Sequence, residues 1–336
     1  MFSLPKQARL VLACGFLMYW LAPGSAAAAG HKLLVHLGSL NCPSQSECIE
    51  VGLNNDNEEA ADIFNPRAAA DSDLLTFSPK LSQYTAGLAC PTVSQCTTVD
   101  NGGDVVTFNP VKPNVTKIST ISGSARGAAG IACPSVMQCS ATSPVGEQAT
   151  FDPRSPHPRF TPLVRNVELL WPVCTSRTLC IATELDTGRI ATWDPRSGAL
   201  RTVAQLASRS GIRAVACPSG TDCVVGTSTG VIAFDPRTPN GNRRALSLPR
   251  ADSRGDASSV SGVSSLSCPS ASICVGLLPN NRVFSFNPKN FAGHVEELRD
   301  VGGTLSDVSC GSTRMCAAIT DGYSGPSREI SFKPQL

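Results

Sequence analysis

The strongest constraint on how this chain can fold is a pair of cysteines separated by five residues, which recurs seven times. The copies begin 41 to 51 residues apart, and each continues with a short apolar run, a turn and a second apolar run. The second run ends in an aromatic residue two positions before a proline. The cysteine pairs are Cys42/Cys48, Cys90/Cys96, Cys133/Cys139, Cys174/Cys180, Cys217/Cys223, Cys268/Cys274 and Cys310/Cys316. The aromatic residues are Phe64, Phe108, Phe151, Trp193, Phe234, Phe286 and Phe332.

The repeat unit consists of short extended segments. Gly and Pro recur every few residues, and the runs between them are β-branched and partly alternating, as in Arg282 to Phe286. The period also suits helical HEAT or armadillo units, but no stretch carries an apolar helical stripe long enough for such a helix. The fifth copy is the clearest. Its strands are predicted at Ile212 to Cys217, Cys223 to Gly226, Val231 to Phe234 and near Arg244–Leu248.

We predict one disulfide within each cysteine pair. Apart from Cys14, which lies in an N-terminal apolar segment, the other fourteen cysteines all belong to pairs. An even cysteine count in an exported chain indicates disulfides. Residues that face each other in an antiparallel hairpin lie about 4.5–5.5 Å apart at Cα, a separation that a disulfide can span. Zinc knuckles use a gap of about two to four residues between cysteines, so this spacing does not indicate a metal site.

Seven such units predict an all-β fold, a seven-bladed β-propeller with four-stranded antiparallel blades and one disulfide per blade. An open stack of β units is the alternative, but a closed ring protects its strand edges and the sequence shows no polar end cap. The last copy ends in its third strand, at Glu329 to Phe332, which leaves its outermost strand missing. We predict that the N-terminal segment His31-Lys32-Leu33-Leu34-Val35 supplies this strand and closes the ring.

Residues 1–29 are predicted to be a secretory signal peptide, and residues 30–336 the propeller domain. Lys6 and Arg9 precede an apolar core of about 12 residues, Leu10 to Leu21, and the small residues Gly24 to Ala29 form a cleavage zone. A core of this length is shorter than the roughly 20 residues of a membrane-spanning helix. Cys14 resembles a lipoprotein acceptor cysteine, although most of the apolar core follows it. We expect a secreted or cell-envelope protein without a membrane span.

The Cys-Pro-Ser-x3-Cys … Phe-Asp-Pro unit, complete at Cys217 to Pro236, resembles the repeats of secreted actinobacterial β-propeller proteins. The segment Ala191 to Gly198 is also similar to the aromatic-Asp-Pro-x-Thr/Ser-Gly turn of streptogramin-lyase-like and quinoprotein-like propellers. The likeness covers nearly all of residues 30–336, but it consists of turn residues. The resemblance therefore implies the propeller fold and hardly any chemistry.

The loops of such a propeller divide between two faces. The disulfide loops and the Asp-Pro turns share one face, while the turns between second and third strands share the other face with the connections between blades. From second cysteine to aromatic, the middle five copies use 11 to 13 residues, and the first and last use 16. These two long loops belong to blades that adjoin in a closed ring, so we expect them to form a polar binding patch. Its residues are Asn54, Asn55, Asp56, Glu58, Asp321, Tyr323 and Arg328.

Two alternatives to this patch stay open. Loops at the seam of a ring also vary in length when nothing constrains them, without any function. The charged connection from Arg250 to Asp256 is a second candidate site, or a solvated loop.

A calcium site does not fit the first long loop. Asn54, Asp56 and Glu58 alternate like calcium ligands, but Glu59 stands where an EF-hand needs glycine. Asn65 stands where the EF-hand needs a bidentate glutamate. We therefore expect no metal.

No motif indicates catalysis or a cofactor. Gly226 to Gly230 matches the Gly-x-Ser-x-Gly nucleophile elbow, but it lies in a predicted hairpin turn instead of between a strand and a helix. The four histidines lack metal-binding or catalytic spacing, and no glycine-rich loop precedes a helix. Lys6 and Arg9 account for the whole formal net charge of +2, so the rest of the chain is neutral and nucleic acid is not an expected partner.

We predict an exported binding protein that uses the variable-loop face to bind a protein or glycan. One alternative is a secreted hydrolase or lyase with its site at the channel mouth, which a cluster of His, Arg and carboxylates there would favour. Another is a structural component of a surface layer, which two uniform faces together with self-assembly would favour.

Overall fold

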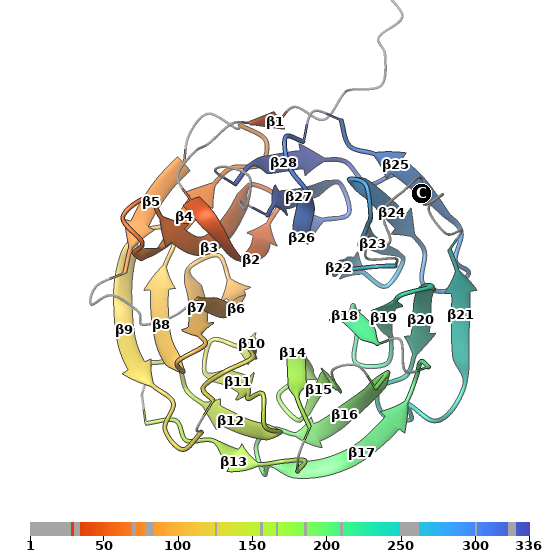
Figure 1. Cartoon of the computed structure of the whole chain (residues 1–336), viewed down its shortest axis with the longest axis horizontal. Coiled ribbons are helices and arrows are strands. Elements are labelled where there is room, and N and C mark those ends of the chain that lie inside the picture. Colours follow the sequence, from red (N-terminus) through yellow and green to blue (C-terminus); the bar gives the residue numbers. More distant parts are fainter. Residues whose placement is uncertain are drawn as a thin grey trace, which may run out of the picture.

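The computed structural model describes residues 28–29, 34–68, 72–77, 84–124, 126–154, 157–165, 167–184, 187–208, 211–248, 262–299, 301–321 and 327–336. Their strands form seven four-stranded antiparallel sheets set around one axis, as the blades of a seven-bladed β-propeller (Figure 1). The fold class predicted from the repeats is confirmed.

The strands of each blade follow one another from the axis to the rim (Figure 1). Blades 1 to 3 comprise β2 (Leu34–Ser44), β3 (Glu47–Asn54), β4 (Glu59–Phe64) and β5 (Ser72–Thr76); β6 (Thr85–Thr92), β7 (Gln95–Asp100), β8 (Asp104–Asn109) and β9 (Asn114–Thr120); and β10 (Gly130–Ser135), β11 (Gln138–Thr142), β12 (Glu147–Phe151) and β13 (Thr161–Pro162). Blades 4 and 5 comprise β14 (Leu169–Ser176), β15 (Leu179–Glu184), β16 (Arg189–Asp194) and β17 (Ala199–Gln205); and β18 (Ile212–Ala216), β19 (Cys223–Thr227), β20 (Gly230–Phe234) and β21 (Arg243–Ser247). Blade 6 comprises β22 (Leu266–Ser270), β23 (Ile273–Leu278), β24 (Arg282–Phe286) and β25 (Gly293–Glu297). Blade 7 comprises β26 (Leu305–Ser312), β27 (Met315–Thr320), β28 (Glu329–Phe332) and, from the start of the chain, β1 (Ala28–Ala29). The four strands predicted for the fifth copy differ from β18 to β21 by one residue at most.

Ring closure uses other residues than the sequence prediction assigned to it. β1 pairs antiparallel with β28, with Ala28 opposite Ile330 and Ala29 opposite Glu329. The predicted closing segment was wrong, because Leu34 and Val35 begin β2, the innermost strand of blade 1; residues 31–33 lie outside the described part of the chain. The physical reason is chain length. The few residues before Cys42 are all needed for the innermost strand of blade 1, so the missing strand has to come from further upstream.

All seven disulfides predicted from the spacing are present, each within one cysteine pair. The bridges are Cys42–Cys48, Cys90–Cys96, Cys133–Cys139, Cys174–Cys180, Cys217–Cys223, Cys268–Cys274 and Cys310–Cys316. Their Cα atoms lie 3.9 to 4.1 Å apart, closer than the separation expected for a regular antiparallel pair. The expected separation was wrong because the hairpins are irregular here: in six blades the register of the first two strands shifts at or beside the first cysteine.

The two cysteines of a bridge differ in burial: the second is a core residue, whereas most of the first cysteines are partly exposed. The second cysteine of every pair is completely buried, with an exposed fraction of 0%, although its place beside the disulfide loop suggests a position at the loop face. These seven residues are Cys48, Cys96, Cys139, Cys180, Cys223, Cys274 and Cys316. The first cysteines are buried (Cys42 and Cys310) or half-buried (Cys90, Cys133, Cys174, Cys217 and Cys268). The physical reason for the difference is that the second cysteine already belongs to the second strand, between the first and third strands of its blade.

The repeat keeps a cysteine and an aromatic residue together because they are neighbours in the packed part of the blade. In every blade the second cysteine lies directly opposite the repeat's aromatic residue on the third strand, as Cys180 lies opposite Trp193. All seven aromatic side chains are buried. Disulfide and ring therefore pack as a cross-strand pair.

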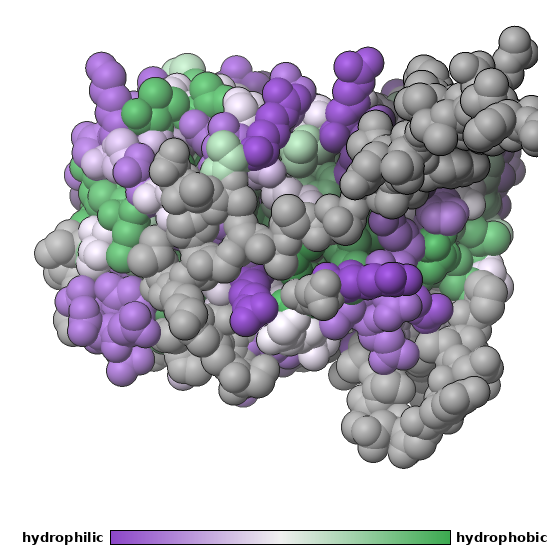
Figure 2. All heavy atoms as spheres, turned by 90° about the horizontal axis from the view of Figure 1, so that it is seen from above, coloured by the Kyte–Doolittle hydropathy of each residue, from purple (hydrophilic) through white to green (hydrophobic). Residues whose placement is uncertain are grey.

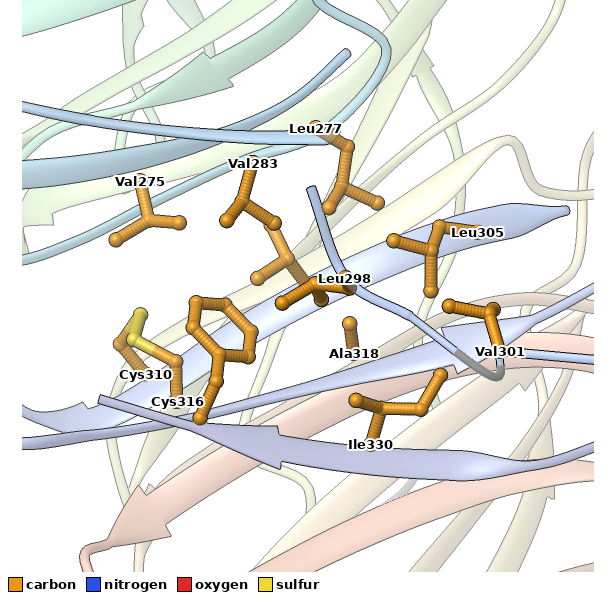
Figure 3. Packing of buried hydrophobic residues seen from close by; sticks show 12 residues of the cluster. Val275, Leu277, Val283, Leu298, Val301, Leu305, Cys310, Cys316, Ala318 and Ile330 are labelled. Atoms are coloured by element: carbon orange, nitrogen blue, oxygen red, sulfur yellow. A yellow bond between two sulfur atoms is a disulfide. The ribbon is translucent and has the colours of Figure 1, made fainter. Parts of the chain in front are cut away.

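The hydrophobic core lies between neighbouring blades. Figure 3 shows the cluster between blades 6 and 7, where Val275, Leu277 and Val283 of blade 6 face Leu305 and Ile330 of blade 7. Seen from the rim, hydrophilic side chains gather along the two edges of the disc and hydrophobic ones show between them (Figure 2). Each blade thus depends on its neighbours for burial, as in other repeat folds.

Hydrogen bonds also join the innermost strands of blades 6, 7 and 1. A side-chain oxygen on one strand accepts a backbone N–H of the next blade, and the pattern repeats around this arc. The bonds run from Val308 N to Ser265 Oγ (3.2 Å), Cys310 N to Ser267 Oγ (3.0 Å), Leu40 N to Asp307 Oδ2 (3.0 Å) and Cys42 N to Ser309 Oγ (2.9 Å). In blades 2 to 5 the equivalent positions carry no hydroxyl or carboxyl group. The innermost strands of these blades are therefore held together by side-chain packing instead of by this type of hydrogen bond.

Candidate functional site

One face of the disc consists of repeated, internally hydrogen-bonded turns. Contacts of the disulfide loop show that the turn after the third strand and the start of the fourth strand lie at this face. Arg67 Nη2, in such a turn, donates to Gln45 Oε1 (2.5 Å), and Arg201 Nη2 on β17 donates to the carbonyl of Thr178 (3.0 Å). We call it the disulfide-loop face. In the Asp-Pro turns, the Asp or Asn side chain accepts the backbone N–H two residues on, as Asp235 does from Arg237 at 2.9 Å. These polar side chains therefore stabilise the turns of this face through hydrogen bonds within each turn.

The opposite face, the variable-loop face, carries the turns between second and third strands and the connections between blades. At the end of the second strand in blades 1, 2, 3, 5 and 7, one polar side chain organises the turn by accepting backbone N–H groups. Asn54 Oδ1 accepts from Asp56 and Glu58, both at 2.9 Å, and Asp100 Oδ1 accepts from Asp104 at 2.7 Å. Ser143 and Thr227 occupy the same position in blades 3 and 5.

The predicted patch residues therefore differ in character. Asn54 is buried and holds its turn, whereas Asn55 and Asp56 are exposed at the tip and Glu58 is half-buried. In the last blade, Asp321 is half-buried, and its backbone N–H donates to the carbonyl of Thr304 (2.8 Å). Tyr323 lies outside the described residues.

The bases of the two long loops do meet at the start of β2. The backbone N–H and hydroxyl of Ser327 donate to the carbonyl of Leu34 at 2.9 and 3.2 Å, and Leu34 pairs across the sheet with Asn54. Arg328 is exposed beside this point, above Gly302. Within the described residues, no group of three or more His, Cys, Asp or Glu side chains is placed to hold a metal ion.

A buried set of carboxyl groups at the seam between blades 1 and 7 escaped the sequence analysis. Glu50 and Asp62 lie opposite each other on β3 and β4, and Glu329 lies on β28; their exposed fractions are 1%, 2% and 4%. Burial raises the pKa of Glu50 to about 8, and the nearby Asp62 and Asp307 raise it further against a hydrogen bond from Ser327. Burial, Asp62 and Glu50 together raise the pKa of Glu329 to about 10. Glu50 and Glu329 therefore hold protons at neutral pH.

The sequence did contain a signal for this seam cluster. The positions of Glu50 and Asp62 in the repeat are occupied by uncharged residues in the other six copies, for example Ala182 and Ala191 in blade 4. A charged residue at an otherwise uncharged repeat position marks a buried carboxyl. A similar group, Glu59, lies between blades 1 and 2, where burial raises its pKa to about 8 and Thr85 Oγ1 donates to it.

The innermost strands of all seven blades enclose a cavity of about 300 Å³ on the propeller axis. Its wall includes the exposed side chains of Trp171 and Arg213, the small residues Gly87 and Gly130, and Asp307 of blade 7. Asp307 is engaged on both oxygens, since Oδ1 accepts from Ser265 Oγ (2.6 Å) and Oδ2 from Leu40 N. None of the described lining residues is a histidine.

A second hollow, of about 700 Å³, opens on the variable-loop face. It lies between the turn of blade 2 that contains Asn101, the connection around Arg126 and the connection that ends at Glu168. Arg126 is exposed and Glu168 half-buried. This hollow brings together an amide, a guanidinium and a carboxylate that sequence reasoning did not single out, because they belong to three different loops.

Fold and site together define a disulfide-bonded, seven-bladed β-propeller with a polar, hollowed loop face. No protein family and no curated protein sequence matches the chain. Among solved structures 1640 chains match, so the fold alone does not discriminate between functions. A chain in the structure described as the crystal structure of a mitotic checkpoint complex superposes with a TM-score of 0.70 at 13% identity, over 100% of this chain and 99% of that one. At this identity the likeness shows the fold only.

Seven disulfides indicate an oxidising, extracytoplasmic environment. In the described part of the chain, no helix has the length and apolar character needed to cross a bilayer.

Proposed function

We propose that this protein is an exported binding protein whose variable-loop face recognises a protein or glycan. The observation that carries the proposal is the hollow of about 700 Å³ on that face, formed by loops of blades 2 and 3 with Asn101, Arg126 and Glu168 around it. Loops held on a rigid scaffold are the usual location of binding residues. By contrast, the disulfide-loop face uses its polar side chains to form its own turns.

The seam loops extend this surface. Asn55, Asp56 and Arg328 are exposed around the point where the two long loops meet, which is a small polar patch of mixed charge. A mixed-charge rim suits a partner with both donors and acceptors, such as a protein or a glycan, better than a polyanion. Export of the protein rests on the predicted signal peptide at residues 1–29.

Binding by this face is testable with three variants of the mature protein. The first combines Arg126→Gln with Glu168→Gln in the hollow, and the second combines Asn55→Ser, Asp56→Ser and Arg328→Gln at the seam. Asn54 stays unchanged because it holds its turn. The control, Arg154→Gln, alters an exposed arginine of the disulfide-loop face.

Each variant is immobilised and incubated with culture fluid and with glycans released from the envelope of the producing cells. We expect the two variable-loop variants to retain at least about tenfold less partner than the wild type, since truncating central contacts costs more than about 1 kcal/mol each. The control should retain as much as the wild type. Equal retention by all variants, or a loss confined to the control, would show that the partner does not use this face.

A further inference from the structure

The innermost strands contain β-bulges, and two of them place unusual side chains on the propeller axis. In five blades the innermost strand shifts register before the disulfide and leaves a residue without a cross-strand partner. These residues are Val35 and Gly38 in blade 1, Ala86 in blade 2, Trp171 (with Pro172) in blade 4, Arg213 in blade 5 and Ser306 in blade 7. Three are small, whereas the adjacent blades 4 and 5 carry an indole and a guanidinium. Bulges commonly redirect a side chain next to a functional site.

Packing does not explain Trp171. Its side chain remains 41% exposed, and its backbone has a φ of 48°, a left-handed conformation that is strained for a large residue. The following Pro172 fixes the bulge against blade 3, where a Cβ on Gly130 would come within 2.5 Å of the proline ring. Trp193, on the third strand of the same blade, is fully buried, as the core requires. A tryptophan that is exposed and strained, yet fixed in place by its neighbours, is typical of a binding site in which a ligand packs on the indole ring.

Arg213 is also exposed in the same cavity, and none of the salt bridges among the described residues involves it. Asp307, the carboxyl group across the axis, already accepts hydrogen bonds on both oxygens from Leu40 and Ser265. The guanidinium is therefore available to an incoming carboxylate, which it can bind through two parallel N–H donors.

We propose that Trp171 and Arg213 form a binding site in the axial cavity for a sugar acid, a pyranose ring that carries a carboxylate. The apolar C–H face of the ring stacks on the indole, and the carboxylate pairs with the guanidinium. Two further lining residues, Ser39 of blade 1 across the axis and Ser264 of blade 6 beside Arg213, carry hydroxyl groups suited to the ring hydroxyls. The cavity of about 300 Å³ lies at the small end of the range of about 300–1,000 Å³ for small-molecule sites. This site is separate from the variable-loop face, so neither proposal depends on the other.

Tryptophan fluorescence reports this site directly. Residues 30–336 contain two tryptophans, Trp171 and the buried Trp193, because Trp20 lies in the predicted signal peptide. The mature protein is titrated with sodium D-glucuronate, D-glucose, sodium acetate and sodium benzoate at constant ionic strength. We expect a saturable change in emission with glucuronate, and at least tenfold weaker effects with glucose and acetate, which each lack one half of the ligand.

Substitutions test the contacts of Trp171 and Arg213 with the ligand separately. Binding is measured by calorimetry, because Trp171→Phe removes the fluorescent indole. Trp171→Ala and Arg213→Gln should each weaken glucuronate binding at least tenfold, whereas Trp171→Phe, which keeps an aromatic face, should weaken it less than Trp171→Ala. Arg237→Gln, an exposed arginine of the disulfide-loop face, should bind like the wild type. Near-ultraviolet circular dichroism and a count of free thiols check that each variant is folded and oxidised.

The competing results are distinct. Equal binding of glucose and glucuronate would show that Arg213 does not bind the carboxylate. Tighter binding of benzoate than of glucuronate would show that the ligand is an aromatic acid and not a sugar acid. Absence of any saturable signal with glucuronate up to its solubility limit would overturn the site, while leaving the variable-loop proposal untouched.

Discussion

The buried carboxyl groups at the seam predict a protein that loses stability as the pH rises through neutrality. Glu50 has an ordinary pKa of 4.5, and burial raises the pKa to about 8 in the folded state. A folded-state pKa above the unfolded one means that the folded protein binds this proton more tightly. The stabilisation is therefore fully present below pH 4.5 and disappears between about pH 4.5 and 8, where the unfolded chain alone releases the proton.

The magnitude follows from the two pKa values. At about 1.4 kcal/mol per pH unit, the interval from 4.5 to about 8 corresponds to about 5 kcal/mol for Glu50, an upper limit because a seam that relaxes or admits water reduces it. Glu50→Gln replaces the protonated acid by a neutral group of the same shape that does not titrate. For a chain of this size, 5 kcal/mol corresponds to about 8 °C in Tm.

The assay is unfolding of the oxidised wild type and of Glu50→Gln between pH 4.5 and 8.5, by urea and by heat. We expect the two proteins to be about equally stable near pH 4.5, and the variant to become progressively more stable than the wild type toward pH 8. The exposed Glu297→Gln on β25 is the matched control and should follow the wild type throughout. A wild type whose stability is constant or rises from pH 5 to 8, with a variant offset independent of pH, would refute the reasoning.

Three further predictions concern the covalent and polar contacts of the ring. Strong reductant should lower Tm substantially, because each bridge restricts the unfolded chain by about 2.4 kcal/mol in the loop-entropy description; an unchanged Tm with all thiols free would contradict this. Asp307→Ala should lower the free energy of unfolding by about 1–3 kcal/mol, because it leaves the N–H of Leu40 without its acceptor; urea unfolding measures the loss, and a neutral result would show that water replaces the carboxylate. If β1 closes blade 7 in the exported protein, signal peptidase must cut before Ala28, and N-terminal sequencing that finds a start at Gly30 or later would exclude this closing strand.

The sequence predicted the fold because the residues that recur are those that define a blade. Cys223 and Phe234 are cross-strand neighbours, and Asp235 forms the next turn, so one copy of the repeat contains most of the local geometry. Strand limits in the fifth copy were accordingly within one residue. The closing strand was assigned to the wrong residues because no repeat motif marks it, and only the length of the innermost strand of blade 1 excludes His31 to Val35.

The candidate site was less predictable, because it depends on contacts between copies. Loop length marked the seam loops as the longest turns between second and third strands, but it did not show that Asn54 is a buried turn residue. Glu50 and Glu329 meet only when the first and last copies adjoin, so neither segment alone indicates a shared proton-binding cluster. Trp171 and Arg213 lie 42 positions apart in the sequence, and two bulges place them in the same cavity. An alignment of the repeats shows only that these two positions differ from the other copies, not that their side chains reach the propeller axis.

Each of the seven disulfides lies within one hairpin, so among the residues that the structure describes no covalent bond links one blade to another apart from the main chain. The disulfides thus stabilise each blade internally. The ring itself is held together by van der Waals contacts and hydrogen bonds between blades and by the β1–β28 pairing. A single proteolytic nick in a connection between blades would convert the circle into an open arc of still-oxidised modules. For the same reason, the insertion or deletion of a whole blade leaves the disulfide pairing of every other blade unchanged.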